Sequence, residues 1–371
     1  MNILIATGIY PPESGGPATY SKLLFDELPV LGIDVEVLPY RKVAHIPKIF
    51  RHSAYFLKVL QKGRNVDLIY AQDPVSVGFP AVCASVILRK PFVVKIVGDY
   101  AWEQGTQRFG VEDLLDEFST KGGYGFTVGL MKKIELFVAK HAHTVVVPSN
   151  YLKKIVSNWG VDEDKISVVY NAFDVPNLLF SKEKLREKHK IKDTTLISVG
   201  RLVPWKGFKT LIEVFPKIQK KIPNLCLVIV GDGADRKMLE LYVSKNNLQE
   251  SVRFTGQLSH NETLEHIAAA DMFVLNTSYE GFSHLLLETM ALKTPLVTTN
   301  AGGNPELIEN RKEGLLVECD DREALANSIY ELLEDTQKTQ KYSESAFNKV
   351  SKFTKERMLK SIVELLSSVK K

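Results

Sequence analysis

The feature that most constrains the fold is a regular alternation of short β-branched runs with longer stretches that suit helices. Short runs that are apolar throughout are typical of parallel strands covered by helices on both faces. The expected strands fall into two sets of six, at residues 3–6, 35–38, 68–70, 92–96, 144–147 and 166–169, and then at 196–199, 225–230, 252–255, 272–275, 296–299 and 315–317. Because strand and helix alternate, right-handed crossovers are expected, and each set predicts a doubly wound α/β sheet.

The length of the chain also predicts two domains. Its 371 residues exceed the size at which a single hydrophobic core stops growing, about 250 to 300 residues. A charged, turn-rich interval separates the two sets of strands, and we place the linker near Pro176. The predicted Rossmann-like domains are residues 1–175 and 176–352, facing each other across a cleft. A final segment, 353–371, has helical periodicity.

Charge and composition exclude several classes of protein. Lys and Arg number 48 against 44 Asp and Glu, which is no footprint for nucleic acid. The N-terminus runs directly into a strand without the pattern of a secretion signal, and the most apolar internal segment, 79–88, is shorter than the about 20 residues that span a bilayer. The three dispersed cysteines form neither a disulfide framework nor a paired metal spacing. We therefore expect a cytoplasmic protein.

The most specific motif runs from Glu280 to Glu288, with seven residues between the two glutamates, and follows an expected strand. Ser283 can cap the helix that follows, so that N–H groups from Gly281 and Phe282 onward face a bound anion. Glu288, about one turn into that helix, can accept hydrogen bonds from the vicinal hydroxyls of a sugar or ribose. An exposed helix start with ordinary acidic residues is the alternative.

A second motif places Arg201 and Lys206 in the loop after the expected strand 196–199. Loops at the carboxyl ends of parallel strands bind ligands in such sheets, and these two cations can hold a diphosphate. Asp232 lies in a glycine turn after the next strand, at the same rim. A solvated basic turn is the alternative for the first loop, and the second loop alone is a weak signal.

The loop after the first strand contains Gly15 and Gly16, where glycine permits close approach of the backbone to a ligand. The glycine fingerprint of a dinucleotide site is absent from every strand-turn-helix context, which argues against a nicotinamide enzyme. The only Asp-x-Asp spacing, Asp162 and Asp164, lies in a loop of the first half. We therefore expect no metal site and a metal-independent activity.

Together, these motifs resemble the retaining glycosyltransferases of family 4, which have the GT-B fold, and the resemblance covers nearly the whole chain. It implies a UDP- or GDP-linked sugar as donor, no separate cofactor, and a glycan or lipid-linked acceptor. By resemblance, Arg201 and Lys206 bind the donor diphosphate, Glu280 contacts the donor sugar and Glu288 holds the ribose. The first domain would bind the acceptor and the second the donor, and the final helix would pack back on the first domain.

The same resemblance supports two further assignments. Residues 252–256, with Arg253 and Phe254, look like the base-binding strand of the family. Many members carry a His-Asp pair after the fourth strand of the first domain, whereas this chain has Gly98 and Asp99. We expect Asp99 to contact a hydroxyl of the acceptor or of the donor sugar, with a plain turn aspartate as the alternative.

Residues 37–66 contain no acidic residue, while apolar residues separate their cations, Arg41, Lys42, Lys48, Arg51, Lys58, Lys62 and Arg64. Such a segment can rest on an anionic membrane, here at the inner face, and a solvated helix over the core is the alternative.

The sequence also leaves other functions open. A sugar-nucleotide epimerase of the same fold would need acid and base groups at the sugar carbon, and a non-catalytic module would bind the donor without turnover.

Overall fold

The computed structural model describes residues 1–13, 15–173 and 180–369. The chain divides into two compact units, one formed by Met1–Ala172 with Lys355–Lys371 and the other by Phe173–Thr354. The linker that we expected near Pro176 lies outside the described residues. Among the residues that are described, no helix combines the length and the apolar character needed to cross a membrane.

The first unit is built on a six-stranded parallel sheet in the order β2-β1-β3-β4-β5-β6. Its strands are β1 Asn2–Thr7, β2 Asp34–Pro39, β3 Leu68–Ala71, β4 Phe92–Lys95, β5 Thr144–Val147 and β6 Ile166–Val168. Its helices are α1 Gly16–Glu27, α2 Arg51–Gly63, α3 Phe79–Leu88, α4 Tyr100–Arg108, α5 Leu115–Thr120, α6 Gly125–His141, α7 Asn150–Asn158 and α16 Lys355–Val369. The order of the strands reverses between β1 and β3, so the loop after β1 lies at the switch point of the sheet.

The second unit has a parallel sheet of its own, in the order β12-β11-β10-β7-β8-β9. Its strands are β7 Thr194–Val199, β8 Leu225–Val230, β9 Val252–Gly256, β10 Met272–Leu275, β11 Leu296–Thr299 and β12 Leu315–Val317. Its helices are α8 Lys182–Lys188, α9 Phe208–Gln219, α10 Arg236–Lys245, α11 His260–Ala269, α12 His284–Ala291, α13 Asn304–Leu307, α14 Arg322–Glu334 and α15 Thr336–Val350. Here the order of the strands reverses between β7 and β10.

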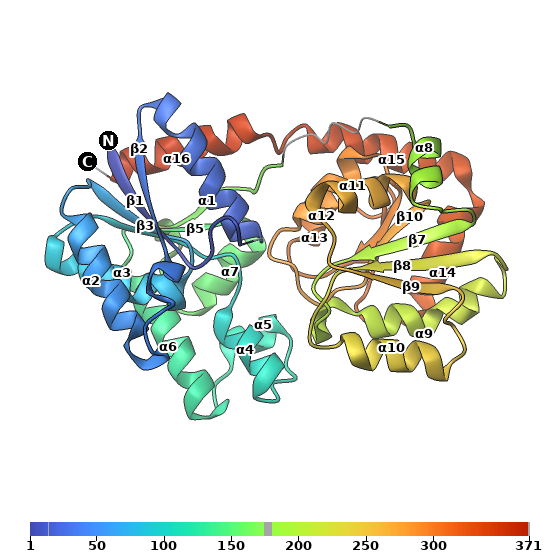
Figure 1. The fold of residues 1–371 in the computed structure, drawn as a ribbon, viewed down its shortest axis with the longest axis horizontal. Coiled ribbons are helices and arrows are strands. Elements are labelled where there is room, and N and C mark those ends of the chain that lie inside the picture. Colours follow the sequence, from blue (N-terminus) through green and yellow to red (C-terminus); the bar gives the residue numbers. More distant parts are fainter. Residues whose placement is uncertain (14, 174–179, 370–371) are drawn as a thin grey trace. The chain divides into compact units, whose positions relative to one another are not determined.

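Helices cover both faces of each sheet, which explains why the central strands are almost entirely buried, while the edge strands β2, β6 and β9 are partly exposed (Figure 1). In the first unit α1 and α16 lie on one face, and α2, α3 and α6 lie on the other. The final helix joins this unit because its apolar residues Met358, Ile362 and Leu366 share a buried cluster with Ile3 of β1 and Leu24 of α1. In the second unit α9, α10 and α14 pack on the apolar face of the sheet that contains Leu227.

All twelve expected strands are present, and their ends differ from the expected ones by at most two residues. The prediction of two doubly wound α/β sheets is therefore confirmed. Short, continuous apolar runs locate these strands well because burial on both faces leaves little room for polar residues within them.

Candidate functional site

The candidate site lies at the carboxyl edge of the second sheet, at its switch point. The loop after β7 contains residues 200–207 and the loop after β10 contains residues 276–283. The two strands are direct neighbours, with Met272 opposite Leu196. Where neighbouring strands send their following helices to opposite faces, the loops diverge and leave room for a ligand.

Lys206 and Glu280 contact each other across this switch point. Lys206 ends the short 3-10 helix Pro204–Lys206 after β7, and Glu280 lies in the loop between β10 and α12. The ammonium group of Lys206 meets the carboxylate of Glu280 in an ion pair whose side chains are only 15% and 12% exposed. From the sequence, Lys206 was expected at the donor diphosphate and Glu280 at the donor sugar, whereas in the structure the two side chains contact each other.

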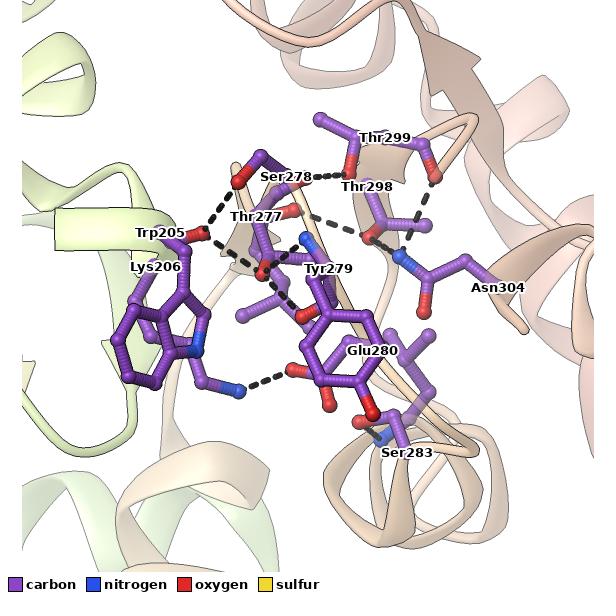
Figure 2. A network of polar contacts seen from close by, with 12 residues as sticks. Trp205, Lys206, Thr277, Ser278, Tyr279, Glu280, Ser283, Thr298, Thr299 and Asn304 are labelled. Atoms are coloured by element: carbon purple, nitrogen blue, oxygen red, sulfur yellow. Dashed lines mark hydrogen bonds and ion pairs between the residues drawn. The ribbon is translucent and has the colours of Figure 1, made fainter. Parts of the chain in front are cut away.

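A network of hydrogen bonds holds the two loops in register (Figure 2). The carbonyl of Trp205 accepts from the N–H of Ser278 at 2.8 Å and from the hydroxyl of Thr277 at 3.0 Å. Behind them, the amide of Asn304 donates to the hydroxyl of Thr298 at 3.1 Å. The hydroxyl of Thr299 donates to the carbonyl of Thr277, so buried hydrogen bonds join the loops after β7, β10 and β11 into one edge.

Glycines let these loops pack backbone against backbone. The N–H of Gly303 donates to the carbonyl of Glu280 at 2.7 Å, and a Cβ atom on Gly303 would lie 2.4 Å from the carbonyl oxygen of Gly281. A Cβ atom on Gly207 would lie 1.7 Å from the carbonyl oxygen of Asn276. The sequence analysis missed Gly303 and the threonine network. Two features of the sequence could have indicated them: the expected strand 296–299 ends in two threonines, and a pair of glycines follows at 302–303.

Arg201 lies exposed in the loop after β7, with its guanidinium carbon 5.4 Å from the centre of the Trp205 ring. Asp232, in the loop after β8, accepts from the backbone N–H of Leu202 through its carbonyl at 3.0 Å. The carboxylate of Asp232 pairs with Arg236 at 3.0 Å. Asp232 therefore ties neighbouring segments together at this rim, and Arg201 is the cation that the rim presents to solvent.

Ser283 caps α12 as expected, because its hydroxyl accepts from the N–H of Leu286 at 3.4 Å. Glu288 lies further along this helix, 9% exposed, and burial raises the pKa of its carboxyl group to about 7. The imidazole Nε2 of His260, on α11, lies 3.7 Å from its Oε1. A buried carboxylate of this kind gains from hydroxyl donors, which is the property that a ribose contact requires.

The remaining residues predicted in the second unit are placed differently. Phe282 is buried, with its ring 5.4 Å from that of Phe353. Arg253 and Phe254 lie in the middle of the edge strand β9, where Phe254 packs against the core of the unit and Arg253 is exposed. The carboxyl end of this strand is Gly256, whose carbonyl accepts from the N–H of Gly231 at 2.9 Å. It is therefore Gly256, and not Phe254, that reaches the edge of the candidate site.

In the first unit, Gly15 and Gly16 begin α1 at the switch point after β1. Gly15 adopts a φ of 142°, and a Cβ atom on Gly16 would meet no atom within 4 Å. The backbone at Gly16 is therefore open to a ligand. Asp162 precedes the exposed 3-10 turn Glu163–Lys165, and the described residues contain no group of three His, Cys, Asp or Glu side chains placed to hold a metal ion.

Asp99 lies at the start of α4. Its side chain is fully buried and caps α4 by accepting from the N–H of Trp102 at 2.7 Å. Burial raises the pKa of Asp99 to about 6 and that of Glu135, also buried, well above its ordinary value. Glu135 accepts from the N–H of Tyr100 at 2.7 Å, on the same helix start. The Asp99 carboxylate is thus enclosed beside a second carboxyl group, its observed contact is the cap of α4, and its contact with a sugar hydroxyl stays a prediction.

Residues 37–66 form β2, short 3-10 turns and α2. The apolar side of α2 faces inward, since Tyr55 and Val59 are fully buried. Three of the seven cations have partners within the unit: Arg51 donates to the carbonyl of Ala44, Lys62 pairs with Glu36, and Arg41 donates to the carbonyl of Tyr10. The apolar side of α2 thus packs on the core, whereas Ile49 and Phe50, before it, are exposed.

Solved structures share this architecture over the whole chain. The structure of Anabaena Alr3699/HepE in complex with UDP-glucose superposes with a TM-score of 0.78 at 24% identity, covering 99% of this chain and 100% of that one. Two parallel sheets of six strands, each wrapped in helices, together with this likeness define the GT-B fold of glycosyltransferases.

The sequence comparisons agree with the fold. Residues 9–176 match the family described as Glycosyltransferase Family 4, and residues 181–349 match the Glycosyl transferases group 1. The chain therefore belongs to glycosyltransferase family 4, group 1.

Two relatives with assigned names match parts of the chain. The N-acetylgalactosamine-N,N'-diacetylbacillosaminyl-diphospho-undecaprenol 4-alpha-N-acetylgalactosaminyltransferase of Campylobacter jejuni is 29% identical over 216 residues, 58% of this chain and 57% of the relative. The GDP-mannose-dependent alpha-(1-6)-phosphatidylinositol monomannoside mannosyltransferase of Mycobacterium tuberculosis is 31% identical over 163 residues, 42% of each chain. The chain thus spans about half the length of the relatives that it matches.

Proposed function

We propose that the protein is a retaining glycosyltransferase that moves a glycosyl group from a nucleoside diphosphate sugar to an acceptor hydroxyl. The observation that carries this proposal is the contact of Lys206 with Glu280 at the switch point of the second sheet. Arg201 lies on the same loop as Lys206, and Glu288 lies on the helix that follows Glu280. One edge of the sheet therefore offers cations for a diphosphate and carboxylates for hydroxyls.

In the proposed reaction, the bond between the anomeric carbon and the diphosphate breaks while the acceptor oxygen bonds to the same face of that carbon. The proton of the acceptor hydroxyl passes to the leaving phosphate, so atoms and charges balance. Arg201 and Lys206 neutralise the charge that develops on the diphosphate, which is the transition-state stabilisation that metal-dependent enzymes assign to a bound ion. Glu280, held by Lys206 and the backbone of Gly303, positions the donor sugar.

The names of similar proteins narrow the substrates. The Anabaena structure contains UDP-glucose and the mycobacterial relative is named as GDP-mannose-dependent, so UDP- and GDP-linked sugars are the donors to test. The Campylobacter relative is named for a diphospho-undecaprenol acceptor, which supports a glycan or lipid-linked acceptor. We propose that the first unit binds it near Gly15 and Gly16, with the protein in the cytoplasm and peripheral contact with the inner face of the membrane, residues 37–66 included.

The test is incubation with UDP- and GDP-sugars, with and without lipid-linked or oligosaccharide acceptors, followed by NMR of the products. We expect an acceptor-dependent release of nucleoside diphosphate and a product with the anomeric configuration of the donor. A new sugar nucleotide formed without acceptor would instead identify an epimerase. Binding without turnover on any acceptor would identify a non-catalytic module.

A further inference from the structure

Helix α6 carries a row of exposed apolar side chains on its outer side. Phe126, Leu130 and Phe137 are 86%, 46% and 41% exposed. At about 100° per residue, spacings of four and eleven residues place all three on one side of the helix. Val128 and Val138 are buried on the other side. The outer side of a surface helix ordinarily carries polar residues, so this row needs an explanation.

Helix α3 continues the apolar surface. It lies beside α6 on the same face of the first sheet (Figure 1), and the rings of Phe79 and Phe137 are 6.0 Å apart. Val86 and Ile87, near the end of α3, are 64% and 63% exposed. We call the exposed apolar residues of the two helices the α3–α6 face; its members are Phe79, Val86, Ile87, Phe126, Leu130 and Phe137.

The charged residues that α6 itself exposes are all basic. Neither of the two described helices exposes a carboxylate, because α3 has no acidic residue and Glu135, the single acidic residue of α6, is buried. Lys133 and Lys140 follow Phe126 by seven and fourteen residues and so lie along the apolar row. Arg89 is exposed at the end of α3. Beyond the N-terminal end of α6, the carboxylates of Asp113 and Glu117 are paired with Lys121.

We infer that the α3–α6 face docks on an anionic lipid bilayer. Apolar side chains flanked by unopposed cations suit the boundary between acyl chains and anionic headgroups. A second copy of this chain fits poorly, because a symmetric contact would set lysines against lysines with no carboxylate on either helix to oppose them. Docking on a membrane would bring the protein to the lipid-linked acceptor of the proposed function, and only this biological role rests on that proposal. The docking itself is measured without any transfer reaction.

The surface differs from the one expected from the sequence. The basic stretch 37–66 exposes the adjacent residues Ile49 and Phe50 together with Leu57, while the apolar side of α2 is buried. In the sequence, the apolar residues of α6 are separated by three and six intervening residues and do not stand out as a row. Only the structure shows which side of each helix faces outward.

The experiment is co-sedimentation of the full chain with vesicles of phosphatidylglycerol and phosphatidylcholine, and with vesicles of phosphatidylcholine alone. We expect binding to the anionic vesicles that weakens as salt rises. The double variant Phe126→Ser/Leu130→Ser and the double variant Lys133→Glu/Lys140→Glu should each bind about tenfold or more weakly. The matched control is Met238→Ser/Leu241→Ser, which changes two exposed apolar residues of α10 in the second unit and should bind like the unchanged protein.

Folding is checked separately by circular dichroism and by the melting temperature of each variant, so that loss of structure is not taken for loss of docking. If the unchanged protein ignores anionic vesicles, or if the α6 variants bind them as well as the control does, the inference is wrong. A dimer in light scattering that the Phe126→Ser/Leu130→Ser change dissociates, without vesicle binding, would assign the face to a second copy. Transfer activity enters none of these readouts, so failure here leaves the proposed reaction standing.

Discussion

The carboxyl edges of the two sheets differ in how tightly their loops pack and in whether their charged side chains are enclosed. In the second unit, backbone contacts at Gly207 and Gly303 fix the loops, and Lys206 and Glu280 meet at their ends. In the first unit, a Cβ atom on Gly16 would meet nothing, and the charged groups at the strand ends are enclosed. Lys95 at the end of β4 is one of them: burial lowers its pKa well below the ordinary value, and its ammonium donates to the side chain of Asn171 at 3.2 Å.

A charged side chain at the end of a strand is therefore available to a ligand only where the backbone holds that side chain at the surface. The second edge has such support, which the proposed diphosphate site requires. The first edge offers open backbone at Gly16, and its charges stabilise helix starts and the core.

The largest expected effect comes from removing the cations of the second edge. Arg201→Ala and Lys206→Ala should each lower the transfer rate about 100- to 1000-fold, because each removes a stabiliser of the leaving diphosphate. The assay uses the matched donor with excess chelator, run beside both variants. Loss of turnover in chelator that magnesium or manganese restores, together with active variants, would refute the metal-free mechanism.

A methyl group tests the backbone support directly. Gly303 has a φ of −84°, so alanine costs no backbone strain there, but its Cβ atom would overlap the carbonyl oxygen of Gly281. Gly303→Ala should lower the free energy of unfolding by about 1 to 3 kcal/mol and weaken nucleotide binding. Gly16→Ala, the matched change in the first unit, should cost less, because apart from its chain neighbours a Cβ atom there would meet no atom within 4 Å. Urea unfolding measures the free energy of unfolding of both variants. Equal losses of stability would show that the backbone is packed no more tightly at the second edge than at the first.

The buried carboxyl of Glu288 predicts a dependence of stability on pH. Burial raises its pKa in the folded state to about 7, so between about pH 4.5 and 7 the folded chain holds a proton that the unfolded chain has released. Stability contributed by this group is therefore lost as the pH rises through that window. Glu288→Gln should remove the loss and add about 1 to 3 kcal/mol at pH 8 without nucleotide, and scanning calorimetry at pH 5 and pH 8 measures it. A variant that is destabilised equally at both values would contradict the assignment.

The smallest effect is expected for Asp99→Asn in the first unit. Asparagine keeps the cap of α4, and the substitution removes one charge from a pair that Glu135 still occupies. Because burial raises the pKa of Asp99 to about 6, stability again falls as the pH rises from about 4 to 6. The variant should gain about 1 kcal/mol at pH 8. If the variant is instead less stable at pH 8 and transfers about tenfold more slowly, Asp99 would be assigned to the binding of the donor or the acceptor.

The sequence predicts the strands and the charged residues of the second edge because both follow local rules. Apolar runs mark β7 and β10, and Arg201, Lys206 and Glu280 follow them within eight residues. It does not predict that Asp99 is enclosed, since burial depends on Glu135 and α6, which come later in the chain. For the same reason it misses the contact of Gly303 with Gly281, which joins loops from different strands.

Calorimetry with UDP and with GDP measures whether the second edge binds a nucleoside diphosphate through its ribose and phosphates. The unchanged protein should bind at least one of them. Glu288→Ala should bind about 10- to 100-fold more weakly, because it loses hydrogen bonds to a charged group worth about 1.5 to 3 kcal/mol. Glu280→Ala should bind equally well or more tightly, since Lys206 is then released to the diphosphate. Failure to bind either nucleotide, or an unaffected Glu288→Ala protein, would contradict the account.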